Sequence, residues 1–332
     1  MKNKKLNFII LLIFTVLVLY FSLRNNFTIV MSYILKMNYV WFFLSVLLMV
    51  MYWVFKALIT FNYVKSYKKD YKFLKAFRLQ LETMFFNGVT PFSSGGGPFQ
   101  ILSLKKDGVG FSKSANVMVI SSFLHQTSLA TFMLISVIAN RFLNLFTKSI
   151  TIRNLSIFGF IICIIVMIFL LLVMFNNKFN KFAVNLFIKL FNKIHIIKNK
   201  DAVISKWDNY LDNIHEGSKI IKADKQKFIK CYTYNLLAML AYVMTPYTIA
   251  KGMNIDLATH QVIIATSYTL MIGMFVPIPG GTGGLEFAFA NLFSNFIVGS
   301  YISSVMLVWR FITYYLGIIL GGIVLNFKRR SS

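Results

Sequence analysis

Acidic residues are scarce in this chain of 332 residues. Aspartate and glutamate together number 10, against 35 lysines and arginines, which gives a formal net charge of +25. The basic residues stand between long apolar runs and form no single compact face, so we do not expect nucleic acid as a partner. The excess fits the positive-inside rule and an attraction to anionic membrane lipids.

Side chains that bind metals or form disulfides are also few. The two cysteines, Cys163 and Cys231, fall in apolar segments, and neither a disulfide framework nor a zinc site is expected from them. The four histidines are dispersed without metal-ligand spacing, and no P-loop or other ATP motif occurs. We therefore expect no metal, no cofactor and no catalytic residues, and any active transport would depend on an ion or lipid gradient.

What the chain has in abundance is apolar sequence. Hydrophobic residues make up 57%, charged residues 14%, and the mean hydropathy is +0.68. Apolar runs long enough to cross a hydrocarbon core of about 30 Å recur along the whole length. We predict an all-α polytopic membrane protein, residues 1–332 forming a single integral membrane domain, with about six full spans at 6–23, 39–61, 115–139, 155–175, 228–250 and 301–325.

The basic residues predict the orientation of these spans. Lys2, Lys4 and Lys5 place the N-terminus in the cytoplasm, and the parity of the spans places the C-terminus there too. The abundance of lysine, asparagine and isoleucine points to a low-GC bacterium, hence to a bacterial plasma membrane. The lysine-rich segment 176–228 is expected to be cytoplasmic. Within it Leu211, Ile214 and Ile221 recur at helical spacing, which leaves an interfacial helix and a solvated linker equally open.

Two breaks rich in glycine and proline interrupt the apolar sequence. They are Thr90-Pro-Phe-Ser-Ser-Gly-Gly-Gly-Pro98 and Pro277-Ile-Pro-Gly-Gly-Thr-Gly-Gly-Leu-Glu286. Non-helical backbone at membrane depth persists only where protein or a watery cavity covers it, and paired breaks mark the binding sites of transporters. We predict two broken, re-entrant hairpins, 79–104 and 259–299, although the arms of the second are also long enough in sequence to be full spans.

Charge parity relates the two hairpins. The first lies within a repeat at 39–139 and dips in from the cytoplasmic side, and the second lies within a repeat at 228–325 and dips in from outside. This is an inverted-topology repeat, from which alternating-access proteins are commonly built. No sequence identity between the halves supports it.

The breaks are the predicted substrate-binding site. Free N–H groups at the start of a half-helix attract phosphate, glycines let a headgroup approach the backbone, and hydroxyls can help to hold it. Glycines in membrane helices also serve close packing alone, but two matched breaks favour binding. The predicted binding residues are Thr90, Ser93, Ser94, Gly95, Gly96, Gly97, Gly280, Gly281, Gly283, Gly284, Glu286 and Arg310, and the prolines that break the helices are Pro91, Pro98, Pro277 and Pro279.

Glu286 and Arg310 are the expected charged pair of this site. A carboxylate inside the membrane is a functional hypothesis by default, because its charge must be paired or neutralised. Glu286 falls near the start of a half-helix, where negative charge is tolerated. Arg310, in the last span, could pair with it or hold a lipid phosphate, and the two roles do not exclude each other.

Two further polar pairs have simpler interpretations. Glu82 has Arg78 one turn away, which predicts a local ion pair at the membrane interface. His125 and Gln126 could line a cavity, but hydrogen bonds between helices are the expected role.

At these residues the sequence resembles a known family. Pro279-Gly-Gly-Thr-Gly-Gly-Leu-Glu286 followed by Trp309-Arg310, together with the first break and Lys105-Lys-Asp-Gly108, is similar to the signatures of the lysylphosphatidylglycerol synthase transmembrane-region family. The resemblance covers nearly the whole chain. It implies a membrane part that flips aminoacylated phosphatidylglycerol to the outer leaflet, while a separate cytosolic domain makes that lipid. Members often carry an acid in the first glycine cluster, where this chain has Gly97.

Three functions follow as expectations. The leading one is a flippase for lysylphosphatidylglycerol, with phospholipid as substrate and resistance to cationic antimicrobial peptides as the outcome. The second is phosphatidylglycerol lysyltransferase activity with a separate synthase partner. The chain stops at Ser332 after the last span, so we do not expect it to be the enzyme itself. The third is transport of a polyprenyl-linked lipid or a small solute, and a homo-oligomer stays open in each case.

Overall fold

The computed structural model describes residues 27–146, 150–176, 178–179, 182, 224–274, 276–299 and 301–326. The predicted span 6–23 and most of the basic segment 176–228, including Leu211, Ile214 and Ile221, lie outside the described residues. The elements are α2 (Phe27–Leu35), α3 (Tyr39–Lys65), α4 (Phe73–Gly88), η1 (Pro91–Ser93), α5 (Gly96–Lys106), α6 (Phe111–Leu143), α7 (Ile150–Phe175), α10 (Lys225–Gly252), α11 (Thr259–Gly273), η2 (Pro279–Gly281), α12 (Gly284–Phe293), α13 (Tyr301–Arg310), η3 (Phe311–Tyr315) and α14 (Leu316–Asn326).

The prediction of an all-α membrane protein is confirmed. Every regular element of the described ranges is a helix, with no strand among them. Four described helices are long and apolar enough to cross a membrane, and they coincide with four predicted spans: Tyr39–Lys65, Phe111–Leu143, Asn154–Phe175 and Tyr301–Asn326. Helix α10 has 28 residues, about 42 Å, but a more polar sequence. Its role as a span and the total of six stay predictions.

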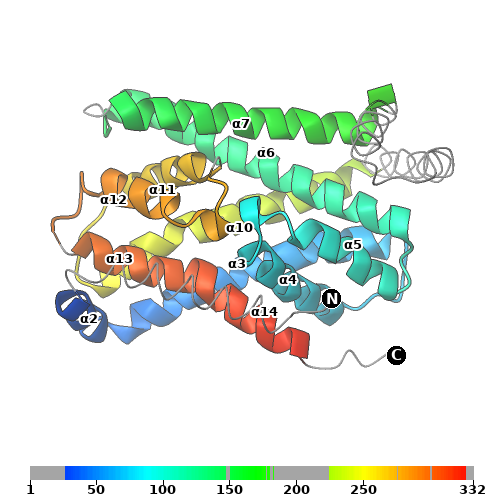
Figure 1. The fold of residues 1–332 in the computed structure, drawn as a ribbon, viewed down its shortest axis with the longest axis horizontal. Coiled ribbons are helices and arrows are strands. Elements are labelled where there is room, and N and C mark those ends of the chain that lie inside the picture. Colours follow the sequence, from blue (N-terminus) through cyan, green and yellow to red (C-terminus); the bar gives the residue numbers. More distant parts are fainter. Residues whose placement is uncertain are drawn as a thin grey trace, which may run out of the picture.

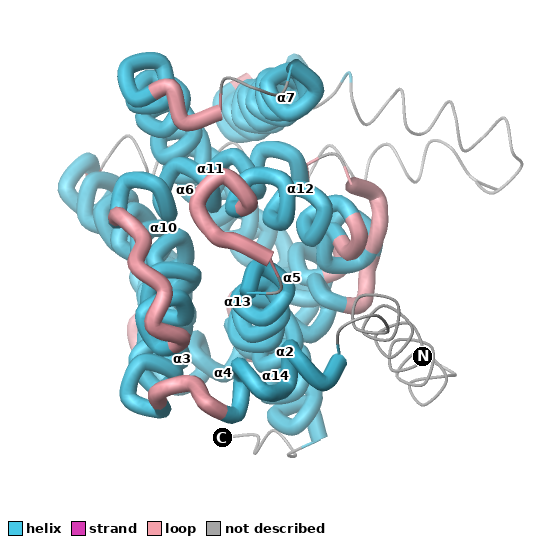
Figure 2. The backbone as a smooth tube through the Cα atoms, turned by 90° about the vertical axis from the view of Figure 1, so that its left-hand side faces the viewer, coloured by secondary structure: helices cyan, strands magenta, loops and turns pink. Residues whose placement is uncertain are grey.

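The long helices form an elongated bundle in which most axes run roughly together (Figures 1 and 2). Helix α3 packs along α10, where the hydroxyls of Ser45 and Thr248 lie 2.7 Å apart, and α4 packs on α14. Helix α7 lies at the edge of the bundle and contacts α6 and α11. Much of its surface is exposed and apolar, as expected of a helix that faces lipid.

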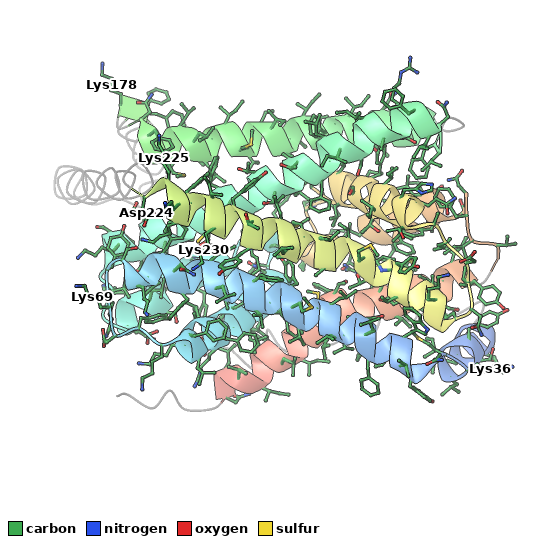
Figure 3. All side chains as sticks on the ribbon, turned by 180° about the vertical axis from the view of Figure 1, so that it is seen from behind. Lys36, Lys69, Lys178, Asp224, Lys225 and Lys230 are labelled. Carbon is green, nitrogen blue, oxygen red and sulfur yellow. The ribbon has the colours of Figure 1, made fainter. Side chains whose placement is uncertain are left out.

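The two broken hairpins occupy opposite halves of the bundle. Figure 1 shows α4 and α5 in one half, α11 and α12 in the other, and the tips between them. Lys69, Lys178, Lys225 and Lys230 gather at one end in Figure 3, while Lys36 lies at the other. This distribution matches the charge pattern used to orient the spans. The cytoplasmic side and the inverted repeat stay predictions.

Helix boundaries differ from the sequence prediction in three places. Helix α4 begins at Phe73, six residues before Leu79, because the two basic residues of its first turns do not interrupt it. The connection between residues 24 and 38 contains α2. Helices α11 and α12 have 15 and 10 residues, about 22 and 15 Å, so neither crosses a core of about 30 Å. Their lengths favour the re-entrant alternative for the second hairpin.

Candidate functional site

The first break is a tight turn with a strained tip. Phe92 and Ser93 adopt left-handed backbone conformations, with φ of 53° and 52°. For residues other than glycine this costs about 1–2 kcal/mol each. The Thr90 hydroxyl closes the turn, since it accepts a hydrogen bond from the Gly95 N–H (2.8 Å) and donates one to the Phe86 carbonyl (2.8 Å). Such strain persists only where the surroundings hold it, and it concentrates at functional sites.

The second break requires glycine for both conformation and space. Gly280, Gly281 and Gly283 have φ of 65°, 63° and 86°. A Cβ atom on Gly280 would also lie 2.2 Å from the Tyr314 ring. The ring is held in place because the Tyr314 hydroxyl donates a hydrogen bond to the Gly88 carbonyl at the end of α4 (2.7 Å). This contact links the last span to the first hairpin.

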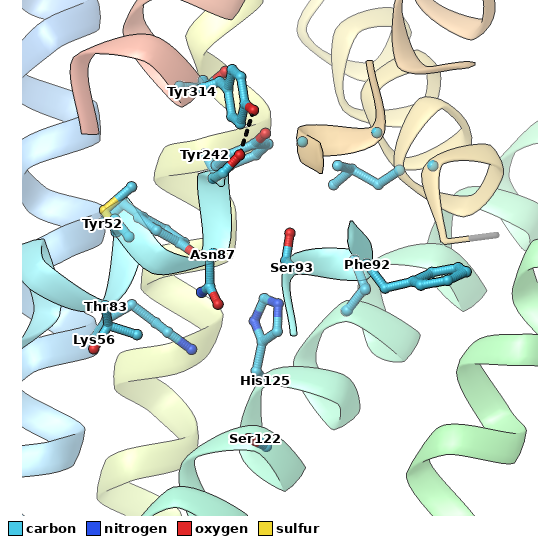
Figure 4. A pocket seen from close by; sticks show the side chains of 18 of the residues that line it. Tyr52, Lys56, Thr83, Asn87, Phe92, Ser93, Ser122, His125, Tyr242 and Tyr314 are labelled. Carbon is cyan, nitrogen blue, oxygen red and sulfur yellow. Dashed lines mark hydrogen bonds between the residues drawn. The ribbon is translucent and has the colours of Figure 1, made fainter. Parts of the chain in front are cut away.

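The tips of the two breaks touch each other, and both line a cavity of about 510 Å³. The first break contributes Gly97 together with Phe92 and Ser93, which Figure 4 labels. The second break contributes Ile278, Gly280, Gly281 and Leu285. Other walls come from α3, α4, α5, α6, α10, α11 and the last span. The polar and charged residues that line it are Tyr52, Lys56, Thr60, Gln80, Thr83, Asn87, Ser93, Gln100, Ser121, Ser122, His125, Gln126, Tyr242, Arg310, Thr313 and Tyr314.

Irregular helix geometry shapes two of these walls. Pro246 in α10 removes the N–H that would bond the Tyr242 carbonyl, and the Thr245 hydroxyl donates to that carbonyl instead (2.7 Å). In the last span a turn of π-helix, η3, directly follows Arg310 and carries Thr313 and Tyr314 to the cavity. Single π turns inside helices frequently occur at functional sites.

Arg310 and Glu286 form the charged pair expected from the sequence. The Arg310 Nε lies 2.8 Å from Glu286 Oε1, an ion pair without the alignment of a good hydrogen bond. The other carboxylate oxygen, Oε2, accepts a hydrogen bond from the Gly283 N–H (2.6 Å) at the start of α12. Arg310 Nη2 donates to the Gly280 carbonyl (3.0 Å), and the guanidinium lies over the Tyr314 ring, 4.5 Å from its centre. These contacts fasten the second break to the last span.

The predicted binding residues fall into two groups. Ser93, Gly97, Gly280, Gly281 and Arg310 line the cavity. The remaining ones do not line it: Thr90, Ser94, Gly95, Gly96, Gly283, Gly284 and Glu286, together with the four prolines of the breaks. Several of these serve the loops themselves, since the Ser94 hydroxyl donates to the Pro91 carbonyl (2.9 Å) and the Gly96 N–H to Asn87 Oδ1 (2.9 Å). Their role in binding stays a prediction.

The two further polar pairs have different outcomes. Arg78 Nε lies 2.9 Å from Glu82 Oε1, so the predicted local ion pair is present, although Glu82 is fully buried rather than interfacial. Arg78 also donates to the Val324 carbonyl on α14 (3.0 Å). His125 and Gln126 both line the cavity, the role that sequence reasoning ranked second. Gln126 also makes the expected contact between helices, since its Oε1 accepts a hydrogen bond from the Cys163 thiol on α7 (3.7 Å).

Sequence reasoning missed Lys56, which lies inside α3 and lines the cavity. The signal was available, because Lys56 is the one charged residue in the apolar run 39–61. An ionisable residue inside a span is by default a candidate for function. Among the described residues that line the cavity there is no aspartate or glutamate.

A second, apolar pocket of about 610 Å³ adjoins this cavity. It is lined by Phe158, Ile162 and Val166 on one face of α7, and by three residues that also line the polar cavity: Phe92, Gln126 and Met274. Helix α7 packs closely against the backbone of α11 beside this pocket. Gly159 makes this approach possible, since a Cβ atom there would lie 1.8 Å from the Met271 carbonyl oxygen. A polar cavity and an apolar pocket thus meet at the strained residue Phe92.

Comparison with known proteins places the chain among membrane proteins of one family. The profile of the Lysylphosphatidylglycerol synthase TM region family matches residues 7–321. A protein described as a UPF0104 membrane protein from Archaeoglobus fulgidus is 26% identical over 306 residues, which cover 90% of this chain and 89% of that relative. No solved structure matches the chain.

Proposed function

Because this chain belongs to the lysylphosphatidylglycerol synthase transmembrane-region family, we propose that it is a lipid flippase that moves a phospholipid between the two leaflets of a membrane. The headgroup would pass through the polar cavity between the two breaks, and the acyl tails would remain in apolar surroundings. The predicted orientation, with the lysine-rich end in the cytoplasm, makes transport to the outer leaflet the expected direction.

The observation that carries this proposal is the junction of the two cavities at Phe92, Gln126 and Met274. A soluble solute needs a polar cavity that is closed off from lipid. A lipid needs a polar cavity that opens sideways onto an apolar one, because its headgroup and tails require opposite surroundings. The face of α7 that carries Phe158, Ile162 and Val166 supplies the apolar side.

The family description supports lysylphosphatidylglycerol as the first candidate substrate. Adding lysine to the outer-leaflet lipid lowers the negative surface charge, which would repel cationic antimicrobial peptides. A separate synthase would then be a functional partner, and anionic lipids would surround the protein. Neither a homo-oligomer nor a catalytic role of this chain is needed for transport.

A second candidate is an anionic lipid without an added amine, such as phosphatidylglycerol or a polyprenyl phosphate. It is favoured by the charges around the cavity, because no aspartate or glutamate is among the described lining residues and Lys56 takes part in none of the ion pairs of the described chain. Glu286, expected to recognise an amine, pairs with Arg310 instead. The ammonium of a lysyl headgroup in this cavity would therefore find no free carboxylate among the described residues that line it.

Reconstitution into liposomes tests the proposal and separates the candidates. Vesicles would carry fluorescent lysylphosphatidylglycerol, phosphatidylglycerol or a polyprenyl phosphate, and outer-leaflet accessibility would be followed over time. Faster movement of one of these lipids than in protein-free vesicles supports a flippase and identifies its substrate class. Equal rates with and without protein for all three lipids would refute the proposal.

Helix α7 offers a matched pair of variants for the role of the apolar pocket. Val166→Trp fills the pocket, whereas Ile165→Trp places the same side chain at a residue that is 59% exposed and lies outside it. We expect slow translocation only for Val166→Trp, with both variants as stable as the wild type. Equal rates for the two variants would show that the tails do not use this pocket.

A further inference from the structure

Lys56 is a charged residue deep within a helix that crosses the membrane. It lies 17 residues, about 26 Å, beyond the first residue of α3. A lysine at such depth is costly unless it faces a polar cavity and finds a partner. Lys56 does line the cavity between the breaks, and in Figure 4 its side chain extends toward the space occupied by His125, Asn87 and Ser93.

The protein supplies Lys56 with only weak polar contact. None of the ion pairs in the described part of the chain includes it. Its Nζ lies 3.4 Å from Asn235 Oδ1, at the outer limit of a hydrogen bond. The Asn235 amide is held firmly, because its Nδ2 donates to the Leu124 carbonyl (2.6 Å) and to the Ser128 hydroxyl (3.1 Å). Asn235 therefore orients the ammonium without neutralising its charge.

Helix α6 places two further polar groups in the same cavity. Ser121 and His125 lie one turn apart, and both line it. The Ser121 hydroxyl and His125 Nδ1 are buried without a hydrogen-bond partner, and the charge of Lys56 acts electrostatically on His125. A buried polar atom normally bonds to protein, to a water, to an ion or to a ligand, and these two share one cavity with Lys56. An oxygen-rich anion would accept hydrogen bonds from the hydroxyl and the ammonium, and from the imidazole in the tautomer that carries its proton on Nδ1.

Arg310 is less suited to this role. Its guanidinium is shared between Glu286, the Gly280 carbonyl and the Tyr314 ring, so its charge is already compensated. Lysine binds phosphate well as a compact point charge. Lys56 has three N–H donors, and Asn235 accepts from at most one of them.

We propose that Lys56 and His125, with Ser121 beside them and Asn235 as positioning residue, bind the phosphate group of the transported lipid. This inference rests on the proposed function, because it assigns the substrate chemistry of the same cavity. The required group is a phosphate monoester or diester. Loss of the charge-assisted hydrogen bonds of Lys56 is expected to weaken binding roughly ten- to a hundredfold.

Lipid-induced thermal stabilisation of the full chain in detergent tests the binding step. The probes are phosphatidylglycerol, diacylglycerol, which lacks the phosphate, and inorganic phosphate. The variants are Lys56→Met and Lys56→Gln, with Lys65→Met as control, since Lys65 lies on the same helix over the Phe61 ring and outside the cavity. We expect phosphatidylglycerol to raise the unfolding midpoint of the wild type and of Lys65→Met only, and diacylglycerol to have no such effect.

Three other results would each overturn one part of this assignment. Equal stabilisation of Lys56→Gln and wild type by phosphatidylglycerol would overturn the assignment. Stabilisation that depends on Lys56 but comes from inorganic phosphate alone would keep the anion site and overturn the lipid as its source. Lipid binding that depends on Lys56 without translocation in liposomes would overturn the flippase and leave the phosphate site standing.

Discussion

Replacing Glu286 by glutamine should destabilise the fold, and this prediction follows from the contacts of Arg310. The Arg310 side chain is 3% exposed, and it pairs with the Glu286 side chain, which is 12% exposed. Arginine stays protonated at any accessible pH. In Glu286→Gln the positive charge therefore remains buried, with a neutral amide in place of its counterion.

The expected loss is about 3–5 kcal/mol, the usual result of removing one partner of a buried ion pair. The double variant Glu286→Gln with Arg310→Met should recover much of that loss, because an apolar side chain of similar length leaves no unpaired charge. If Glu286 served only to recognise a headgroup, the single variant would be as stable as the wild type and would lose transport alone.

The assay is thermal unfolding of the purified variants in one detergent, arranged as a double-mutant cycle. Asp256→Asn is the control, because it removes the exposed ion pair with Lys251 outside the spans, and such pairs contribute little. We expect a lower midpoint for Glu286→Gln than for the double variant, and no change for the control. A single variant as stable as the wild type would refute the reasoning.

Two other predictions concern helix contacts. Gly159→Ala should separate α7 from α11, because the new Cβ atom would lie 1.8 Å from the Met271 carbonyl oxygen. We expect a lower midpoint of thermal unfolding for this variant, and an unchanged midpoint would contradict the prediction. The second of these predictions concerns Asp224, which caps α10. Two hydrogen bonds from Lys227, one from its side chain and one from its backbone N–H, hold the pKa of Asp224 below its usual range. Because this pKa is lowered in the folded protein, the ionised cap stabilises the helix at pH values above the ordinary pKa of about 4. That stabilisation is lost as the pH falls through the pKa of the folded state. In acid, the backbone amides in the first turn of α10 should lose protection against hydrogen exchange. Those in the first turn of α3, which the uncharged Asn38 caps, should keep it. Equal losses in the two helices would contradict the assignment.

The breaks could be predicted because glycine and proline act locally. Pro91 and Pro279 each open a short 3-10 turn where the sequence predicts the helix to end, and the described helices coincide with four predicted spans. The start of α4 could not be predicted in the same way. Its early basic residues read as a loop, and only tertiary contacts, such as the bond from Arg78 to the Val324 carbonyl, show how a helix accommodates them.

The site was predicted less completely than the fold. The pairing of Glu286 with Arg310 follows from the scarcity of other charges, but the sequence does not show that it fastens the second break rather than facing a ligand. The cavity depends on which helices meet, so the convergence of Lys56, Ser121 and His125 from α3 and α6 has no local signature. Lys56 was visible as a lone charge in an apolar run, yet its partnership with α6 required the three-dimensional structure.

The central claim is that a lipid headgroup passes between the two breaks, and photocrosslinking tests it most directly. The protein would be reconstituted with phosphatidylglycerol that carries a photoreactive group on its headgroup, and the labelled peptides would be mapped after illumination. The account predicts labels on cavity residues such as Lys56, Asn87 and Ser93, reduced in Lys56→Gln and competed by unlabelled lipid. Labels confined to the lipid-facing surface, such as Ile165 on α7, and unchanged in Lys56→Gln, would contradict it.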